Sequence, residues 1–229
     1  MRLFFFSFSL FFLFLASGNA QPIAVKNKTE YPFWIQMPKN YNTNEKQPLL
    51  IFLHGKSLSG TDLNKVKRYG VLRAIEKGRN IPAIVVAPQL VKGSWNPDKV
   101  LEVIDFVKKN YNISDSQIYV CGMSLGGYGT LHFAGKHPDK ITAAVAICGG
   151  GNTKDACQLA KLPLWIQHGE IDYIVPMSES IKITEAIKKC NENAPVTLTL
   201  IKGGNHSNVE RLFHQDELYN WLFNQKKEE

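Results

Sequence analysis

Short apolar runs that alternate with longer amphipathic stretches constrain the fold of this 229-residue chain more than any other feature. The runs at residues 48–53 (PLLIFL) and 81–87 (IPAIVVA) contain no polar side chain, as is typical of strands buried on both faces of a sheet. Residues 100–111 instead carry apolar side chains at the spacing of a helix. Strands that are repeatedly followed by helices require crossover connections, which favour a mainly parallel sheet with helices on both faces. We therefore predict an α/β fold.

The same alternation runs from residue 31 to near the end of the chain. Further strands are predicted at residues 31–37, 117–121, 143–148, 164–167 and 195–201, and further helices at residues 125–136, 178–190 and 208–224. No linker rich in Pro, Gly or Ser divides these elements, so residues 21–229 are predicted to form a single domain. In such sheets the functional side chains gather in the loops beyond the carboxyl ends of the strands.

The first twenty residues have the pattern of a secretory signal peptide. Arg2 supplies a positive start, residues 3–15 are almost entirely apolar, and residues 18–20 (GNA) place small side chains at a cleavage site. The apolar run is shorter than the roughly 20 residues that span a bilayer, so we expect no stable membrane anchor. The sequence therefore predicts cleavage near Ala20 and a secreted or periplasmic protein.

Export makes disulfides possible for the four cysteines of the chain. Cys121 and Cys148 lie in apolar runs that are predicted to be buried strands, so both are expected to be core thiols. Cys157 precedes a strand and Cys190 ends the helix that follows it, which favours the pairing Cys157–Cys190. Four cysteines allow three full pairings, and the sequence does not choose among them. No CxxC motif or Cys/His spacing indicates a metal site.

The formal net charge of +7 does not indicate a nucleic-acid-binding protein. The lysines are spread along the chain, without a dense basic run and without interleaved aromatic residues. Such a distribution is typical of a solvated surface, so we expect no nucleic-acid partner.

A candidate nucleophile lies in the sequence GMSLG at residues 122–126, which matches G-x-S-x-G. The motif follows a predicted strand and opens a predicted helix, which is the context that gives it meaning. A sharp turn there exposes the hydroxyl of Ser124 at the positive end of the helix, and the flanking glycines remove side chains that would collide with nearby backbone. The alternative is a glycine-rich helix start with a capping serine.

A serine hydroxyl needs a base to become an effective nucleophile. His206 lies in the loop between the last predicted strand and the last predicted helix, and it follows Ser124 in the expected chain order. His132, His137 and His214 lie in or beside predicted helices, where surface or packing roles are expected.

The base in turn needs a carboxylate that holds its tautomer and offsets its charge. Asp172 follows the strand at residues 164–167 and is the preferred candidate. Glu170 is the local alternative and Asp155 a more distant one. His168 is expected to brace this loop.

An acyl-transfer site also needs backbone N–H donors for the oxyanion. We predict that one comes from Leu125, directly after the nucleophile, and the other from Lys56, in the loop after residues 48–53. His54 is expected to be structural. Trp95, in a loop after a strand, is a candidate to line the substrate pocket, and a packed loop anchor is the equal alternative.

These elements together resemble the α/β-hydrolase superfamily. Within it they resemble small, lidless carboxylesterases related to the dienelactone hydrolases and to the phospholipase/carboxylesterase group. The resemblance rests on LHG at 53–55, GMSLGG at 122–127, the stretch from HG at 168–169 to VP at 175–176, and GNH at 204–206. Dienelactone hydrolases use a cysteine nucleophile where this chain has Ser124, which argues against their specific reaction. Secreted members of this kind often act on feruloyl or acetyl esters of plant polysaccharides.

The resemblance and the motifs predict a serine esterase that works by two-step acyl transfer without metal or organic cofactor. Only about fifteen residues, 149–163, are available for a cap, which predicts an open site. A peptidase of prolyl-oligopeptidase type, a lysophospholipase or a thioesterase would use the same triad. A non-catalytic binding module on this fold is the remaining alternative, although such modules typically lose one of the three residues.

Overall fold

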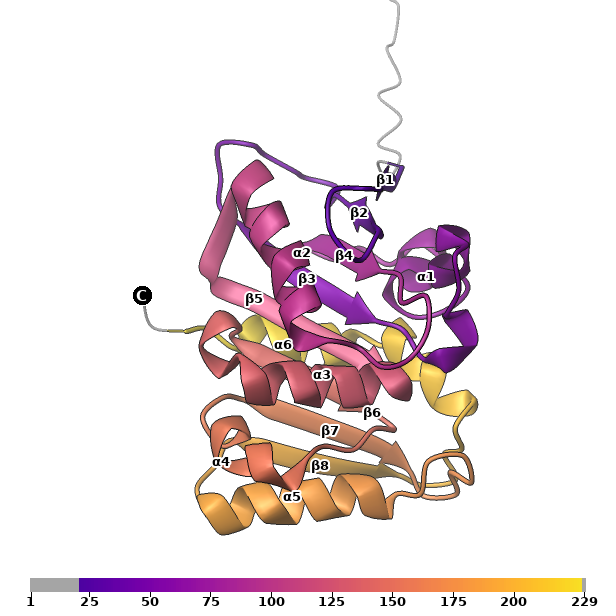
Figure 1. Ribbon diagram of the computed structural model, residues 1–229, viewed down its shortest axis with the longest axis vertical. Coiled ribbons are helices and arrows are strands. Elements are labelled where there is room, and N and C mark those ends of the chain that lie inside the picture. Colours follow the sequence, from indigo (N-terminus) through magenta and orange to yellow (C-terminus); the bar gives the residue numbers. More distant parts are fainter. Residues whose placement is uncertain (1–20, 228–229) are drawn as a thin grey trace, which may run out of the picture.

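Eight strands form one sheet in the computed structural model, which describes residues 21–227 (Figure 1). Their order across the sheet is β1-β2-β4-β3-β5-β6-β7-β8. The predicted signal peptide lies outside the described residues. The strands are β1 (Ile23–Val25), β2 (Phe33–Gln36), β3 (Gln47–Leu53), β4 (Ile84–Pro88), β5 (Ile113–Met123), β6 (Ala143–Ile147), β7 (Leu164–Gly169) and β8 (Val196–Ile201).

Neighbouring strands pair in parallel from β4 to β8, and antiparallel pairing within residues 21–227 is confined to one edge, between β1 and β2 and between β2 and β4. This confirms the predicted mainly parallel sheet. Parallel pairing brings the carboxyl ends of β3, β5, β7 and β8 to one edge, so the loops after them can meet there. The predicted strand at residues 81–87 begins late, because only Ile84–Pro88 are paired in the sheet.

Helices cover both faces of the sheet (Figure 1). They are α1 (Val71–Glu76), α2 (Pro97–Asn110), α3 (Leu125–Lys136), α4 (Ala156–Leu159), α5 (Ser178–Cys190) and α6 (Asp216–Asn224). Along β3, Leu49 and Ile51 pack into the core with α2, α3 and α5, whereas Leu50 and Phe52 pack into the core with α1 and α6. The uninterrupted apolar run of β3 is therefore explained by burial on both faces.

The predicted helix at residues 208–224 is wrong as a single element. It is a 3₁₀ helix, Asn208–His214, followed by α6, with an extended residue, Gln215, between them. Arg79 contacts the residues on both sides of Gln215. Its guanidinium donates to the carbonyl of His214 and to the carboxylate of Asp216. A residue 135 positions away in sequence thus stabilises the break before the last helix.

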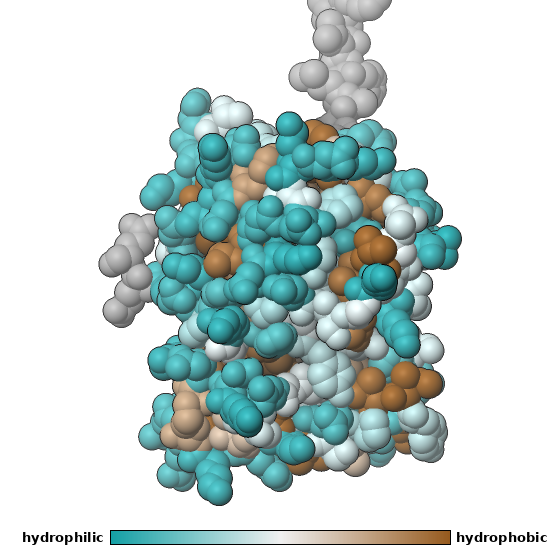
Figure 2. Space-filling model, in the orientation of Figure 1, coloured by the Kyte–Doolittle hydropathy of each residue, from teal (hydrophilic) through white to brown (hydrophobic). Residues whose placement is uncertain are grey.

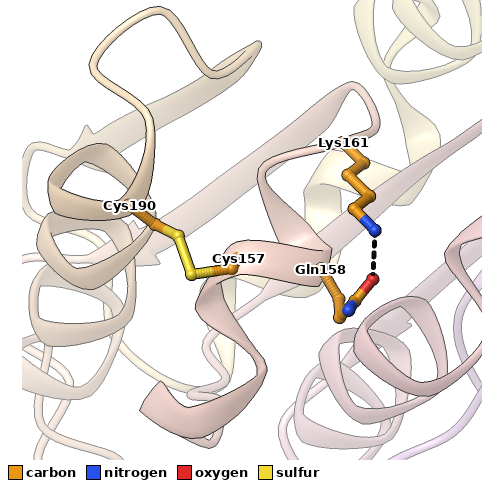
Figure 3. Close-up of a disulfide and its surroundings, with 4 residues drawn as sticks. All are labelled: Cys157, Gln158, Lys161 and Cys190. Atoms are coloured by element: carbon orange, nitrogen blue, oxygen red, sulfur yellow. Dashed lines mark hydrogen bonds between the residues drawn. A yellow bond between two sulfur atoms is a disulfide. The ribbon is translucent and has the colours of Figure 1, made fainter.

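A disulfide joins Cys157 in α4 to Cys190 at the end of α5 (Figure 3). Cys121 and Cys148 are buried and unpaired. The segment between β6 and β7 holds only one 3₁₀ turn and α4, so no cap domain covers the sheet within residues 21–227. In the same part of the chain, no helix is both long and apolar enough to cross a membrane.

Candidate active site

Ser124 occupies the turn between β5 and α3, with φ of 59° and ψ of −123°. A positive φ is costly for a residue with a Cβ and persists only where the surroundings impose it. Here the Ser124 N–H donates to the carbonyl of Ile147 at 2.8 Å, which ties the turn to the end of β6. The strained turn exposes the Ser124 hydroxyl beyond the sheet edge, as G-x-S-x-G in a strand–turn–helix context requires.

Two glycines of the motif are needed because backbone approaches them closely. A Cβ on Gly122 would lie 2.3 Å from the carbonyl oxygen of Gly126, and a Cβ on Gly126 would lie 1.8 Å from that of Leu53. Neither contact is tolerable between non-bonded atoms, and both involve backbone that cannot move aside. The pattern of glycines in the motif thus follows from the packing of α3 against the ends of β5 and β3.

The loops after β7 and β8 bring two polar side chains to Ser124. The Ser124 hydroxyl lies 2.9 Å from Nε2 of His206, and the His206 Nδ1 lies 2.7 Å from Oδ2 of Asp172. Both distances are those of hydrogen bonds. Three residues separated by up to 82 positions in sequence therefore form one continuous hydrogen-bonded chain from carboxylate to hydroxyl.

Asp172 is buried, yet its surroundings favour the charged form. Its Oδ1 accepts hydrogen bonds from the N–H groups of Ile174 and Val175, both at 2.9 Å. Burial raises the pKa of this carboxyl, but the bonds from Val175, His206, the Cys148 thiol and Ile174 outweigh it, and the pKa is lowered below 3.8. The carboxylate is thus available to orient the imidazole and to offset its positive charge.

The loop that carries Asp172 is braced by His168, as the sequence predicts. Its Nε2 donates to the carbonyl of Val175 at 2.9 Å, which closes the turn around the carboxylate. Burial lowers the pKa of His168, so the ring is held neutral. It faces Asp172 Oδ2 at 3.6 Å, which is farther than the bond that His206 makes.

None of the competing candidates forms a hydrogen bond to the Ser124 hydroxyl within residues 21–227. His137 pairs with Asp98 at 2.8 Å and His214 pairs with Glu210 at 3.1 Å. Glu170 and His132 are exposed side chains, and neither forms a hydrogen bond within residues 21–227.

The two predicted oxyanion donors begin helical segments next to Ser124. Lys56 begins a 3₁₀ turn after β3, and Leu125 begins α3. The first N–H groups of a helix have no partner within the helix, and neither of these N–H groups has a backbone acceptor in the described part of the chain. Both are free to donate to a negatively charged oxygen.

The loop after β3 is held by His54, which is completely buried. Its Nε2 accepts the N–H of Leu90 at 3.1 Å, and its Nδ1 donates to the carbonyl of Gly55 at 2.8 Å. This pattern requires the neutral ring. Burial lowers the pKa of His54 to about 4, against smaller raising contributions from its hydrogen bonds to Gly55 and Gln89.

Trp95 supports the same loop. Its indole N–H donates to the carbonyl of His54 at 3.1 Å, its ring packs edge-on against the His54 ring, and only 3% of it is exposed. Trp95 also lines a hollow of about 490 Å³, together with Leu125 and Tyr128. Trp95 is thus a packed loop anchor that reaches the wall of this hollow.

A cavity of about 470 Å³ opens onto Ser124 and His206. Its other walls include Lys56, Tyr69 and Ile174, and the last of these is 73% exposed. Figure 2 shows a hydrophobic area at the right-hand edge of the molecule, where the loops that follow β7 and β8 lie in Figure 1. No sequence signal marks either side chain as part of a site, because Tyr69 lies outside every motif and Ile174 has no recognised role within the stretch at residues 168–176.

Cys148, Asp172 and His206 also offer three atoms within 4.8 Å of one another, which is a spacing suited to a metal ion. A metal would need the Cys148 thiolate, whereas in this structure the Cys148 thiol donates a hydrogen bond to Asp172. His206 would also have to give up a hydrogen bond to Asp172 or Ser124. The donor set fits the hydrogen-bonded arrangement better than it fits a cation.

Residues 96–218 match the family model described as phospholipase/carboxylesterase. A bifunctional acetylxylan esterase/xylanase from Neocallimastix patriciarum is 34% identical over 86 residues, which are 37% of this chain and 13% of that protein. The match thus spans about an eighth of that relative.

Solved structures resemble nearly the whole described chain. A thermostable esterase superposes with a TM-score of 0.75 and 27% identity, over 90% of this chain and 63% of its own. The feruloyl esterase module from Clostridium thermocellum, complexed with sinapinate, gives a TM-score of 0.67 and 16% identity over 88% of both chains. At that identity the second likeness shows the fold alone.

Proposed function

Because the chain belongs to the phospholipase/carboxylesterase family, we propose that it hydrolyses carboxylic esters through an acyl-enzyme on Ser124. His206 is the general base, Asp172 its carboxylate partner, and the N–H groups of Lys56 and Leu125 form the oxyanion hole. The observation that carries the proposal is the continuous hydrogen-bonded chain from Asp172 through His206 to the Ser124 hydroxyl.

The reaction has two steps of similar form. The Ser124 oxygen attacks the ester carbonyl while His206 takes its proton, and the two N–H groups stabilise the oxyanion. As the C–O bond breaks, His206 returns that proton to the leaving alkoxide, which departs as an alcohol. Water then attacks the acyl-enzyme, His206 takes a proton from it and passes this proton to Ser124, and the acid is released.

We propose acyl esters of carbohydrates, acetyl or feruloyl, as the substrate class. The support is the similarity to the acetylxylan esterase/xylanase, together with the absence of a cap between β6 and β7 in residues 21–227. A site without a cap admits an ester that is attached to a polymer. We also propose that residues 1–20 are a signal peptide that exports a single catalytic domain, residues 21–229, because polymeric esters are extracellular substrates.

The test compares the mature wild-type protein with Ser124→Ala and with Ser116→Ala, a serine remote from the site, as the control. The substrates are p-nitrophenyl acetate, methyl ferulate, acetylated xylan and a peptide p-nitroanilide. We expect ester hydrolysis by wild type and control, and a loss of about a thousandfold or more in kcat for Ser124→Ala.

Two results would contradict the proposal. Cleavage of the anilide alone would make the protein a peptidase. Equal rates for wild type and Ser124→Ala would show that Ser124 is not the nucleophile, and the absence of Ser124 labelling by a fluorophosphonate would support that conclusion.

A further inference from the structure

Tyr69 lies beside the nucleophile although no motif contains it. It follows the 3₁₀ helix Leu63–Lys67 and directly precedes the turn into α1. Its ring packs edge-on against Phe52, and its hydroxyl oxygen accepts the N–H of Gly55 at 2.7 Å. The phenol is thus held at its ring by β3 and at its hydroxyl by the loop after β3.

Gly55 shows how close the phenol comes to the nucleophile. A methyl group placed on Gly55 would lie 2.6 Å from the Tyr69 hydroxyl oxygen and 3.2 Å from Cβ of Ser124. The phenol and the nucleophile therefore lie against the same side of Gly55, and both line the cavity of about 470 Å³. The oxyanion of an acyl transfer forms next to the serine, in this space.

The phenol has a proton to offer there. The Gly55 N–H uses one acceptor position of the oxygen, and the Ser57 hydroxyl, which is also a hydrogen-bond partner, can donate as readily as it accepts. Burial and the charge of Glu210 raise the pKa of Tyr69, so the group stays protonated at neutral pH. An O–H group that accepts a hydrogen bond is also polarised into a stronger donor.

We propose that the Tyr69 hydroxyl is a third hydrogen-bond donor to the oxyanion on Ser124, beside the N–H groups of Lys56 and Leu125. The inference rests on the proposed acyl-enzyme mechanism. No proton is transferred: the O–H turns toward the oxygen as negative charge develops, and the Gly55 N–H remains bonded to the phenol. This makes Tyr69 a catalytic residue in addition to the triad.

The first test is Tyr69→Phe, with Tyr119→Phe as the matched control. Tyr119 is a buried tyrosine whose hydroxyl donates to the carbonyl of Gln225. For Tyr69→Phe we expect kcat on p-nitrophenyl acetate to fall about 10- to 100-fold, since one preorganised donor is removed and two remain. KM should change less than about twofold, because the interaction forms only in the transition state. An unchanged kcat would refute the proposal.

Tyr69→Phe also leaves the Gly55 N–H without its acceptor, so a second measurement separates donation from support of the loop. Fluorotyrosine at position 69 keeps the acceptor but ionises at lower pH, and the phenolate cannot donate. We expect kcat to decline at lower alkaline pH than in wild type, with no such change for fluorotyrosine at position 119. The other titratable groups that line the cavity, Lys56, His206 and Glu210, are the same in both proteins.

The outcomes separate this inference from the proposed function. If kcat declined at the same alkaline pH in wild type and in the protein with fluorotyrosine at position 69, Tyr69 would only support the loop. The inference would then fail while the esterase assignment stood. A wild type that neither cleaves esters nor reacts at Ser124 would remove the proposed function, and the inference with it.

Discussion

Acidification from pH 7 to pH 5 should destabilise this protein through His54. The ring is completely buried, and both nitrogens are used in the neutral state: Nε2 accepts from Leu90 and Nδ1 donates to Gly55. A proton added at Nε2 would face the Leu90 N–H, so two donors would point at each other. The unfolded chain has no such restriction and takes the proton readily.

The size of the effect follows from the two pKa values. The pKa of His54 is about 4 in the folded protein and 6.5 for an unperturbed histidine, so the unfolded state binds more protons between these values. Stability is therefore complete above the unfolded pKa and falls as the pH drops toward the folded one. Linkage gives a loss of about 2 kcal/mol in the free energy of unfolding between pH 7 and pH 5.

Urea unfolding of wild type and His54→Gln at pH 7 and pH 5 measures this loss. The glutamine cannot titrate, so the variant should lose about 2 kcal/mol less than wild type over this interval. His168, whose pKa is also lowered by burial, titrates in both proteins and cancels in the comparison. An equal loss in the two proteins would refute the argument. So would an NMR titration of the wild-type ring that places its pKa near 6.5.

The remaining predictions concern the acid and the disulfide. Asp172→Asn keeps the acceptor for Ile174 and Val175 but turns an amide N–H toward His206, which imposes the wrong tautomer; kcat should fall about 10⁴-fold, as at comparable triads. The control is Glu170→Gln on the same loop, and a larger loss there would make Glu170 the acid. The Cys157→Ser/Cys190→Ser variant releases a link between residues 33 positions apart, which should cost about 4 kcal/mol of unfolding free energy. Urea titration with and without dithiothreitol checks this, since the reductant should weaken wild type and leave the variant unchanged.

The parallel sheet could be predicted from the sequence because strands that are buried on both faces consist of uninterrupted apolar residues. Residues 48–53 and 143–148 are apolar throughout, and both ranges lie in or overlap strands of the sheet, β3 and β6. The placement of Ser124, Asp172 and His206 in loops at one edge followed from the same argument, since parallel strands end together. The sequence therefore predicted which loops meet at that edge of the sheet.

Features set by contacts between distant side chains could not be predicted in this way. The break at Gln215 is contacted by Arg79, 135 positions away from His214, and the Gly55 N–H bonds to Tyr69, 14 positions away. Helix α1 itself is only six residues long, too short for a clear helical period. Trp95 left two interpretations open, because burial and pocket lining use the same aromatic side chain.

The same long-range contacts bear on how the loop after β3 would work in the proposed mechanism. The loop after β3 is held by Leu90 and Trp95 on the His54 side and by Tyr69 on the Gly55 side. Catalysis by oxyanion stabilisation requires donors that are already oriented before charge develops. A short loop cannot supply that rigidity from its own residues. It comes instead from two other segments, the connection between β4 and α2 that carries Leu90 and Trp95, and the turn before α1 that carries Tyr69. Substitutions at these supports should therefore lower kcat more than they raise KM, although only Tyr69 is proposed to touch the reacting oxygen.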